Sequence, residues 1–409
     1  MRVLILNQPF YPDVAATAQH AHDLGRYLVE RGHEVDVVAS RSIYGETGAS
    51  LPARERVDGI DVHRVGMSVF GKKGIAARLA DFLLFYDLAA LKVLTLPRAD
   101  VVVTLTTPPF IGLVGATLRL LRGSRWVYWG MDLYPDVPVA LGVMKPDGWL
   151  TLGFEWLNRW LMRACDRTVA LGRCMKRLIV SKGVSAENVE VIGVWAANEP
   201  ARRDPAASSY RGAWGLDGRF VVMYSGNLGL AHDAETLIAA AERLRDREDI
   251  RFVFVGSGKR MAEIRERVEA LPNAQIYGYQ PRERLEDLLS MADVHLISQL
   301  PSFTGVVVPS KLYGIMAAGR PSLFVGPEDA EVALELAESG AGLRIDVGDV
   351  DGLVSGIESL AGDREGCRAM GDRALAATRS RHAVEHRCAA WERLLVEVVQ
   401  TSRYTDDAV

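Results

Sequence analysis

The sequence predicts an α/β protein with two doubly wound parallel sheets, and three observations lead to this fold class. Short runs rich in β-branched residues alternate with segments of helical periodicity, which is the pattern of parallel βα units. The alternation starts afresh at Phe220 after an interruption. A chain of 409 residues also exceeds the size at which one hydrophobic core stops growing, so two domains are expected.

Each expected strand is followed by a segment of helical pattern, such as residues 233–246. The first series of strands is expected at residues 3–6, 35–38, 101–103, 126–129 and 169–171. The second series is expected at residues 220–226, 251–258, 274–279, 294–298 and 321–326. After Asp363 the pattern is helical as far as Gln400, with no further strand.

The domain boundary is predicted in residues 198–218, where prolines and small residues replace the core pattern. We therefore expect an N-terminal domain over 1–200 and a C-terminal domain over 201–375. Residues 376–409 are expected to form a helical segment that packs across both. Since ligands of such open sheets bind outside the carboxyl ends of the strands, the active site is expected between the domains.

Composition places the chain among ordinary folded cytoplasmic proteins. Its four cysteines form no CxxC pair, which fits neither a zinc cage nor a disulfide framework. The apolar stretch near the N-terminus is too short for a secretory signal, and threonines and prolines interrupt the uncharged run 101–118, so no spanning helix is expected. The net charge of −4 disfavours nucleic-acid binding.

A first candidate binding loop is YSGNLGLAHD at 224–233, which predicts a strand, a glycine turn and a helix start. Gly226 and Gly229 permit close backbone approach, and the free N–H groups of the helix start can hold a phosphate. A plain βα turn is the alternative reading of the same pattern.

A second candidate lies at 302–326, where Pro309 suits a first helical position and Gly319 with Pro321 ends the helix. Lys311 falls in the first turn of that helix. A cation there opposes the helix dipole unless an anion is bound. The position therefore indicates a diphosphate ligand, although surface lysines also occur at such places by chance.

Asp132 and Asp136 follow an apolar strand, where an acid could bind an acceptor hydroxyl or accept its proton. A helix cap or turn role is the alternative for both, and more so for Asp13. The histidines predict no metal site, because His20 and His22 diverge on a helix and His382 with His386 lacks a third ligand.

Residues 71–98 combine five Lys or Arg residues with Phe82, Phe85, Tyr86 and many leucines. Such a helix could lie in a membrane interface with its basic groups near anionic lipid, or could be an ordinary amphipathic helix that covers the sheet.

The chain resembles the family 4 glycosyltransferases of GT-B fold over nearly its whole length. The resemblance is to the branch that adds sugars to polyprenyl-diphosphate-linked acceptors of bacterial surface polysaccharides. It is carried by NQPFYPDVAATAQ, TTPPF, MDLYPDVPVALGV, YSGN, VGSGKR and PSKLYGIMAAGRP. The resemblance implies two Rossmann-like domains, retention of anomeric configuration and no required metal or other cofactor. It also implies a cytoplasmic enzyme, peripheral at the inner face of the membrane.

By position, the resemblance implies that the C-terminal domain binds a nucleotide diphosphate sugar, with UDP favoured over GDP on family frequency. The implied donor-binding residues are Gly226, Asn227, His232, Tyr279, Gln280, Gly305, Val306, Ser310 and Lys311. The N-terminal domain is implied to bind the acceptor, a lipid-linked sugar or another glycan. The candidate acceptor-binding residues are Asp13, Ala15, Ala16 and Asp136, with Asp132 and Lys311 as catalytic residues.

The sequence departs from the family at three places. The two glutamates usually found eight positions apart are Val306 and Gly314 here. The Arg and Lys of the usual diphosphate loop are Asn227 and His232, and a glycine pair is replaced by Ala15 and Ala16. Lys311 is therefore expected to be the main positive charge on the leaving diphosphate.

Two alternatives bind the same donor without transferring its sugar to an acceptor. One is a sugar nucleotide epimerase of GT-B fold, which needs acid–base groups that the C-terminal half scarcely offers. The other is a non-catalytic relative that has lost the glutamate pair. A nicotinamide-dependent dehydrogenase is disfavoured, because neither series of strands begins with GxGxxG.

Overall fold

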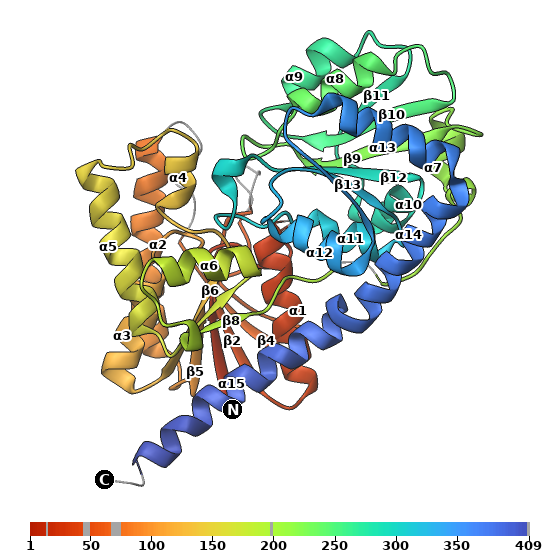
Figure 1. Ribbon diagram of the computed structural model, residues 1–409. Helices are drawn as coiled ribbons and strands as arrows, with labels where there is room; N and C mark the ends of the chain where they lie inside the picture. Colours follow the sequence, from red (N-terminus) through yellow and green to blue (C-terminus); the bar gives the residue numbers. More distant parts are fainter. Residues whose placement is uncertain (14, 44–49, 67–74, 197–198, 407–409) are drawn as a thin grey trace. The chain divides into compact units, whose positions relative to one another are not determined.

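The chain folds into two compact units, which are shown in Figure 1. The computed structural model describes residues 1–13, 15–43, 50–66, 75–196 and 199–406. Unit 1 comprises Met1–Gly193 and Glu385–Val409, and unit 2 comprises Val194–Val384. The expected domain boundaries at residues 200 and 375 compare with Gly193 and Val384 here, and the residues from Glu385 onward belong to unit 1.

The described part of unit 1 contains an eight-stranded sheet of order β3-β4-β2-β1-β5-β6-β7-β8. Its strands are β1 (Arg2–Leu6), β2 (Glu34–Ser40), β3 (Arg54–Val57), β4 (Ile60–Val65), β5 (Val101–Thr104), β6 (Arg125–Gly130), β7 (Arg167–Ala170) and β8 (Val189–Val191). The sheet is parallel as predicted except at β3, which runs antiparallel to β4. Asp58 and Gly59 form the turn between them, with φ angles of 49° and 83°. Both residue types tolerate positive φ, which two-residue hairpins require.

Helices cover this sheet and supply much of its core. They are α1 (Ala16–Glu30), α2 (Ile75–Thr95), α3 (Gly112–Arg122), α4 (Asp136–Ala140), α5 (Trp149–Ala164), α6 (Arg173–Ser181), η1 (Ala186–Asn188) and α15 (Val384–Asp406). Phe85, Ala89 and Val93 of α2 pack into one buried cluster with strand residues of β1 and β5. From α15, Trp391 packs on Trp129 of β6, with ring centroids 4.4 Å apart, and this contact anchors the C-terminal helix in unit 1.

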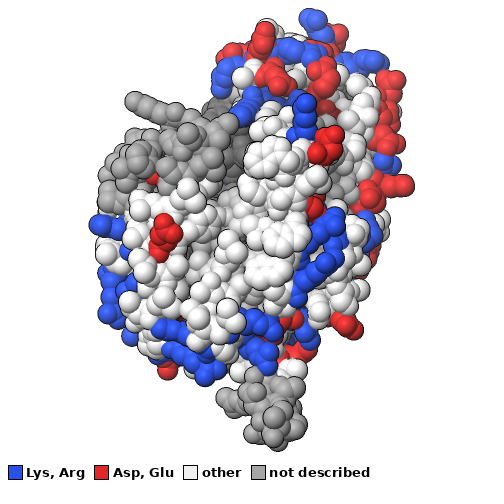
Figure 2. Space-filling model, turned by 90° about the vertical axis from the view of Figure 1, so that its left-hand side faces the viewer, with Lys and Arg blue, Asp and Glu red and all other residues white. Residues whose placement is uncertain are grey.

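Helix α5 turns its aromatic side chains outward. Trp149 and Trp156 are 80% and 68% exposed, whereas Thr151 and Asn158 of the same helix are buried. A helix that covers a sheet normally faces the core with its apolar side. Figure 2 looks onto the side of the molecule that carries α5, and uncharged surface dominates the middle of that view.

The described part of unit 2 contains a six-stranded sheet of order β11-β10-β9-β12-β13-β14, parallel throughout as predicted. Its strands are β9 (Phe220–Asn227), β10 (Ile250–Ser257), β11 (Ala274–Tyr277), β12 (Val294–Ser298), β13 (Ser322–Val325) and β14 (Gly342–Ile345). Its helices are η2 (Pro205–Ala207), α7 (Ser209–Ala213), α8 (Glu235–Arg243), α9 (Met261–Val268), η3 (Arg282–Arg284), α10 (Leu285–Ser290), η4 (Pro301–Phe303), α11 (Lys311–Ala317), α12 (Glu331–Ser339), α13 (Val350–Gly362), α14 (Arg364–Ala377) and η5 (Thr378–His382). Buried clusters fill both faces of this sheet.

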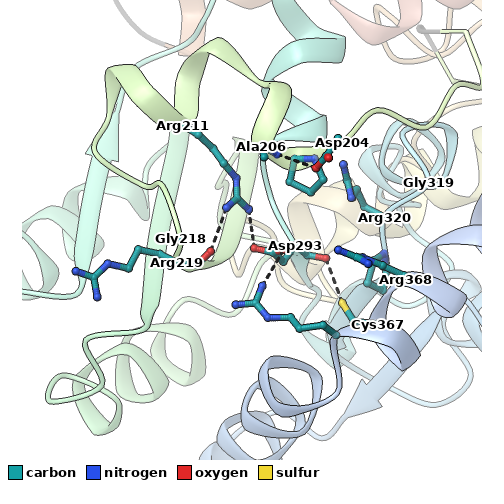
Figure 3. A pocket seen from close by; sticks show the side chains of 13 residues that line it. Asp204, Ala206, Arg211, Gly218, Arg219, Asp293, Gly319, Arg320, Cys367 and Arg368 are labelled. Atoms are coloured by element: carbon teal, nitrogen blue, oxygen red, sulfur yellow. Dashed lines mark hydrogen bonds and ion pairs between the residues drawn. The ribbon is translucent and has the colours of Figure 1, made fainter.

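A buried carboxylate ties the amino ends of two central strands of unit 2 together. Asp293, just before β12, accepts hydrogen bonds from the Arg211 guanidinium at 2.6 Å and from the Val221 amide of β9 at 2.8 Å. Its other oxygen accepts a bond from Arg364 at 3.1 Å. These groups line a pocket of about 320 Å³ (Figure 3). Arg320, also in its wall, donates to the carbonyl oxygens of Arg203 and Ser290.

Substitution of Asp293 by alanine should lower the free energy of unfolding by about 3 kcal/mol, because it leaves Arg211 as an uncompensated buried charge. Chemical denaturation measures this change. Asp246→Ala is the matched control, since Asp246 and its partner Arg245 are 95% and 61% exposed, and exposed pairs contribute at most about 1 kcal/mol. Equal losses in the two variants would contradict a structural role for Asp293.

Candidate functional site

The candidate site of unit 2 forms where β9 and β10 end. Their ladder continues to the pairs Gly226–Gly256 and Asn227–Ser257, so the two glycine turns lie side by side. A Cβ atom on Gly256 would stand 2.2 Å from the Gly226 carbonyl oxygen, and Gly256 has φ of 128°. Only glycine fits this close approach of two backbones. Gly226 itself has φ of 114° and lies near the Lys311 side chain.

Lys311 is the first residue of α11, and its side chain lies beside Gly226 at the end of β9. Its ammonium donates to the Tyr224 hydroxyl and lies 3.8 Å from the centroid of the Tyr224 ring. Among the described residues no acidic group pairs with it, and burial lowers the pKa of Lys311 to about 7. An anion beside this ammonium would favour its charged form. The site is therefore electrostatically suited to bind a phosphate.

His232 lies at the other side of the same loop. Its Nδ1 is hydrogen-bonded to the carbonyl oxygen of Ser298, the last residue of β12. Burial first, and then the charge of Lys311, lower the pKa of His232 to about 3. The imidazole is consequently neutral at physiological pH, and its other ring nitrogen can donate or accept a hydrogen bond according to the tautomer.

A buried glutamine shapes the loop that leads into α11. The amide nitrogen of Gln299 donates to the carbonyl oxygens of Phe303 and Val307, each at 3.0 Å. Between these anchors Gly305 adopts φ of 76° and Val306 is buried. Ser310, directly before Lys311, is exposed. The loop is thus held through its backbone carbonyl groups by an uncharged side chain.

Tyr279 and Gln280, the predicted neighbours of the base, lie just beyond β11. The Tyr279 side chain is exposed, and it lies close enough to Tyr224 for its charge to contribute, after burial, to the raised pKa of Tyr224. Gln280 accepts a hydrogen bond from the Tyr210 hydroxyl at 3.3 Å. The structure thus gathers Tyr279, the glycine turn and Lys311 around Tyr224.

In unit 1, Asp132 lies directly beyond β6 in the loop that precedes α4. Its amide donates to the Thr106 hydroxyl at 3.1 Å, which links the loop after β6 to the loop after β5. Burial raises the pKa of the Asp132 carboxyl to about 6. A carboxylate with a pKa close to neutrality is well suited to accept a proton.

The other acceptor candidates have different surroundings. Asp13 accepts a hydrogen bond from the Ala15 amide at 2.9 Å, an arrangement typical of a turn that precedes a helix. Ala15 is the N-cap of α1, and Ala16 is its first residue. Asp136 forms an ion pair with Lys182 at 2.8 Å, and Lys182 also binds Glu155. The carboxylate of Asp132, by contrast, forms no ion pair of this kind among the described residues.

The remaining predictions concern metals, thiols and membranes. The described residues contain no cluster of His, Cys, Asp and Glu that could hold a metal ion. The Nε2 atom of His382 lies 2.9 Å from a carboxylate oxygen of Glu335. All four cysteines lie in the described part and are buried without disulfides. No helix that the structure describes is long and apolar enough to span a membrane.

The predicted interfacial segment 71–98 corresponds mainly to α2. Lys72 and Lys73 lie outside the described residues. From Asp81 onward the helix packs Phe85, Ala89 and Val93 into the core, as an amphipathic cover does, while Leu83, Leu91 and Leu94 stay exposed.

Sequence reasoning missed two residues of this site. Tyr224 receives the Lys311 ammonium, and Arg260 lies close enough to His232 for its charge to help lower the histidine pKa. The Nε atom of Arg260 is buried and has no hydrogen-bond partner among the described residues. Both residues lie in quoted motifs, YSGN and VGSGKR, but strand periodicity marks Tyr224 as a core residue and only the fold brings Arg260 to the glycine turn.

Comparison with known proteins identifies the family of this chain. Residues 16–195 match the model of the glycosyl transferase 4-like domain, and residues 208–376 match that of the glycosyl transferases group 1. The chain belongs to the family 4 glycosyltransferases. It is accordingly a transferase of GT-B fold, with one Rossmann-like domain in each unit.

Three individual proteins illustrate the likeness. The putative colanic acid biosynthesis glycosyl transferase WcaI of Escherichia coli is 29% identical over 87% of this chain and 91% of its own. A GDP-mannose-dependent alpha-mannosyltransferase of Mycobacterium tuberculosis is 26% identical over 83% of this chain and 85% of its own. The structure of Anabaena HepE in complex with UDP covers both chains completely, with a TM-score of 0.68 and 16% identity.

The Lys311 amine should titrate near pH 7 in the ligand-free glycosyltransferase, because burial disfavours its charged form. Carbon-13 NMR of reductively methylated lysines measures this, with Lys311→Arg to assign the resonance. In Tyr224→Phe the pKa should fall further, since the ammonium loses a hydrogen-bond acceptor. A resonance that titrates only above about pH 9, near the ordinary lysine value, would contradict the account.

Proposed function

We propose that the protein is a retaining glycosyltransferase that moves a sugar from a nucleotide diphosphate donor to a lipid-linked or glycan acceptor in bacterial surface polysaccharide biosynthesis. The single observation that carries the proposal is the buried ammonium of Lys311, which has no acidic partner among the described residues and lies at the glycine turn of unit 2. The likeness to a putative colanic acid glycosyl transferase supports the class of product.

The proposed donor is bound by unit 2, and UDP is favoured as its nucleotide. The likeness to a protein crystallised with UDP supports this choice, whereas the likeness to a GDP-mannose-dependent enzyme supports GDP as the competing base. The backbone at Gly226 would approach the diphosphate, Lys311 would neutralise it, and Tyr279 would lie near the base. The reaction is proposed to need no metal, because the positive charge of Lys311 and Arg260 can stabilise the leaving group.

Departure of the nucleoside diphosphate builds negative charge on its oxygens and positive charge on the sugar. Preorganised donors aimed at the developing charge stabilise such a transition state most. The Lys311 ammonium is held in place by Tyr224, so little reorganisation is needed when the charge develops. Retention is proposed to follow from attack on the same face of the sugar, assisted by the leaving phosphate. A glycosidase-type carboxylate pair is then unnecessary.

Asp132 is proposed to bind the acceptor hydroxyl and to draw off its proton. Its raised pKa of about 6 keeps it ionised at pH 7 yet basic enough to share a proton. Asp13, Ala15 and Ala16 are proposed to line the acceptor side as well. Asp136 is the weakest of the candidates, because Lys182 already engages its carboxylate.

Donor binding and turnover discriminate this proposal from its alternatives. A thermal-shift screen against UDP, GDP, ADP and NAD should give a selective rise with one uridine or guanosine nucleotide, because a ligand that binds the folded state stabilises it. Release of that nucleotide from a nucleotide sugar then shows turnover. An epimerised donor without release would indicate the epimerase, and binding without turnover despite suitable acceptors would indicate a non-catalytic relative.

Replacement of Lys311 by alanine should lower the turnover number by about 100-fold or more, the usual effect of removing one group that stabilises developing charge. The unfolding temperature should not fall, because the substitution relieves a buried charge. Nucleotide release under saturating donor measures the rate. Arg243→Ala, which also removes one positive charge from unit 2 but at an exposed helix position, is the control. Near wild-type turnover in Lys311→Ala would remove this lysine from the mechanism.

The variant Asp132→Asn should reduce kcat/KM for the acceptor by about 100-fold or more, because the amide cannot accept a proton. Donor binding should stay within about twofold. In the wild type, kcat/KM should rise as the pH increases through about 6, because the carboxyl ionises. The pH profile of the variant should lack this rise. Exposed Asp147→Asn serves as the control. Equal loss of donor binding and transfer would instead assign Asp132 a structural role.

A further inference from the structure

We propose that the outward side of α3 and α5 is a docking surface for an anionic lipid bilayer. The α3–α5 face is defined by Leu120, Leu121, Trp149, Leu152, Trp156 and Trp160, all of which are exposed. Monomeric soluble proteins rarely expose contiguous apolar patches of this kind without a partner. The part of the inference that concerns a lipid-linked acceptor rests on the proposed function. The assignment of this face to a bilayer does not depend on that function.

The outward tryptophans of α5 are the first observation that supports the proposal. The buried side of this helix contains Leu161 and Met162 together with Thr151 and Asn158, and Asn158 accepts a hydrogen bond from the buried Tyr128 hydroxyl. Its tryptophans Trp149, Trp156 and Trp160 are exposed. Since other residues of the helix already supply its contacts with the core, packing within unit 1 does not account for the exposed tryptophans. Tryptophan and leucine are the side chains by which interfacial helices enter the boundary between lipid headgroups and acyl chains.

The charges around this face identify its partner. Glu155 is the one acidic residue in α3 and α5, and it is engaged by Lys182 at 2.8 Å and by Arg159 at 2.7 Å. Basic residues occur on both helices, among them Arg119 and Arg163. Figure 2 shows Lys and Arg along the lower edge of the uncharged surface. Asp147, just before α5, is exposed, but arginines outnumber acidic residues on the two helices. An apolar face with an excess of basic groups matches an anionic lipid surface.

A second copy of this chain fits the face less well. A two-fold dimer places the same patch on both subunits. The basic groups of one α3–α5 face would then meet those of the other, with no free carboxylate on either helix to compensate. A bilayer offers an apolar interior to the exposed tryptophans and leucines and negatively charged headgroups to the basic residues. It is therefore the partner that fits this face.

One loop connects the α3–α5 face to Asp132, the residue that is proposed to bind the acceptor. Phe110 packs on Phe154 of α5, with ring centroids 5.2 Å apart. In the same loop, Thr106 accepts the hydrogen bond from the Asp132 amide. Docking of α5 on a bilayer would therefore bring Asp132 close to the lipid surface. A sugar acceptor attached to a membrane lipid could then reach this carboxylate without leaving the bilayer.

Vesicle flotation of the purified full chain tests the proposal. The wild type should float with vesicles of phosphatidylglycerol and phosphatidylcholine at low salt, less at high salt, and little with phosphatidylcholine alone. The double variant Trp149→Ser/Trp156→Ser should bind about tenfold less, because it removes the two most exposed aromatic anchors of the face. The control is Leu343→Ser/Val347→Ser, which removes two exposed apolar side chains of unit 2 and should float like the wild type.

Three further measurements keep the interpretation unambiguous. Circular dichroism and the unfolding temperature check that both double variants fold. The thermal shift with nucleotide is read on the same samples, so a failure of donor binding is seen separately from a failure of vesicle binding. Wild-type tryptophan fluorescence should shift to shorter wavelength on anionic vesicles, and this shift should be largely lost in the tryptophan double variant.

Two outcomes would overturn the proposal. One is equal flotation of the wild type and Trp149→Ser/Trp156→Ser, or no flotation of the wild type at low salt. The other is a lipid-free dimer, seen by analytical ultracentrifugation, that dissociates in the tryptophan double variant. That result would assign the face to a second copy of the chain.

Discussion

The ammonium of Lys311 is held beside Tyr224 at the carboxyl ends of the unit 2 strands without an acidic partner among the described residues, and the proposed binding of the donor depends on this interaction. Burial makes the charged form costly. The same burial makes an incoming phosphate a favourable ligand, because it compensates the charge. A carboxylate in place of Tyr224 would stabilise the ammonium permanently and would weaken the attraction for the donor.

The charged side chains at the two ends of the unit 2 sheet differ in how they are paired. At the amino ends, Asp293 is paired with Arg211 and bonded to the backbone of β9, and the neighbouring Arg320 donates to carbonyl oxygens. At the carboxyl ends, Lys311 has no acidic partner among the described residues, and Arg260 pairs with the exposed Glu263 at 3.2 Å while its Nε atom has no hydrogen-bond partner there. The pairs at the amino ends stabilise the sheet, and the donors left at the carboxyl ends are available for a ligand.

In unit 1, the carboxylate that is proposed to bind the acceptor, Asp132, lies on a loop that is linked to the surface helices. Thr106 joins the Asp132 loop to the segment that contains Phe110, and Phe110 packs on α5. The inner side of α5 is buried and its polar Asn158 is hydrogen-bonded, whereas its tryptophans are exposed. Recognition of a lipid-linked acceptor is proposed to combine this surface with the Asp132 carboxylate, so neither feature need supply all the affinity.

The sequence by itself determined the two-sheet architecture, the glycine turn and the position of Lys311, because strand and helix periodicity and glycine placement are local properties of the chain. It also contained the Asp58–Gly59 hairpin signal, which the parallel pattern around it obscured. Only the tertiary structure decided that Tyr224 and Arg260 adjoin the glycine turn, that Asp136 pairs with Lys182, and that α5 faces outward with its tryptophans. These facts depend on contacts between segments far apart in the chain, and local patterning carries no information about which distant side chain supplies a partner.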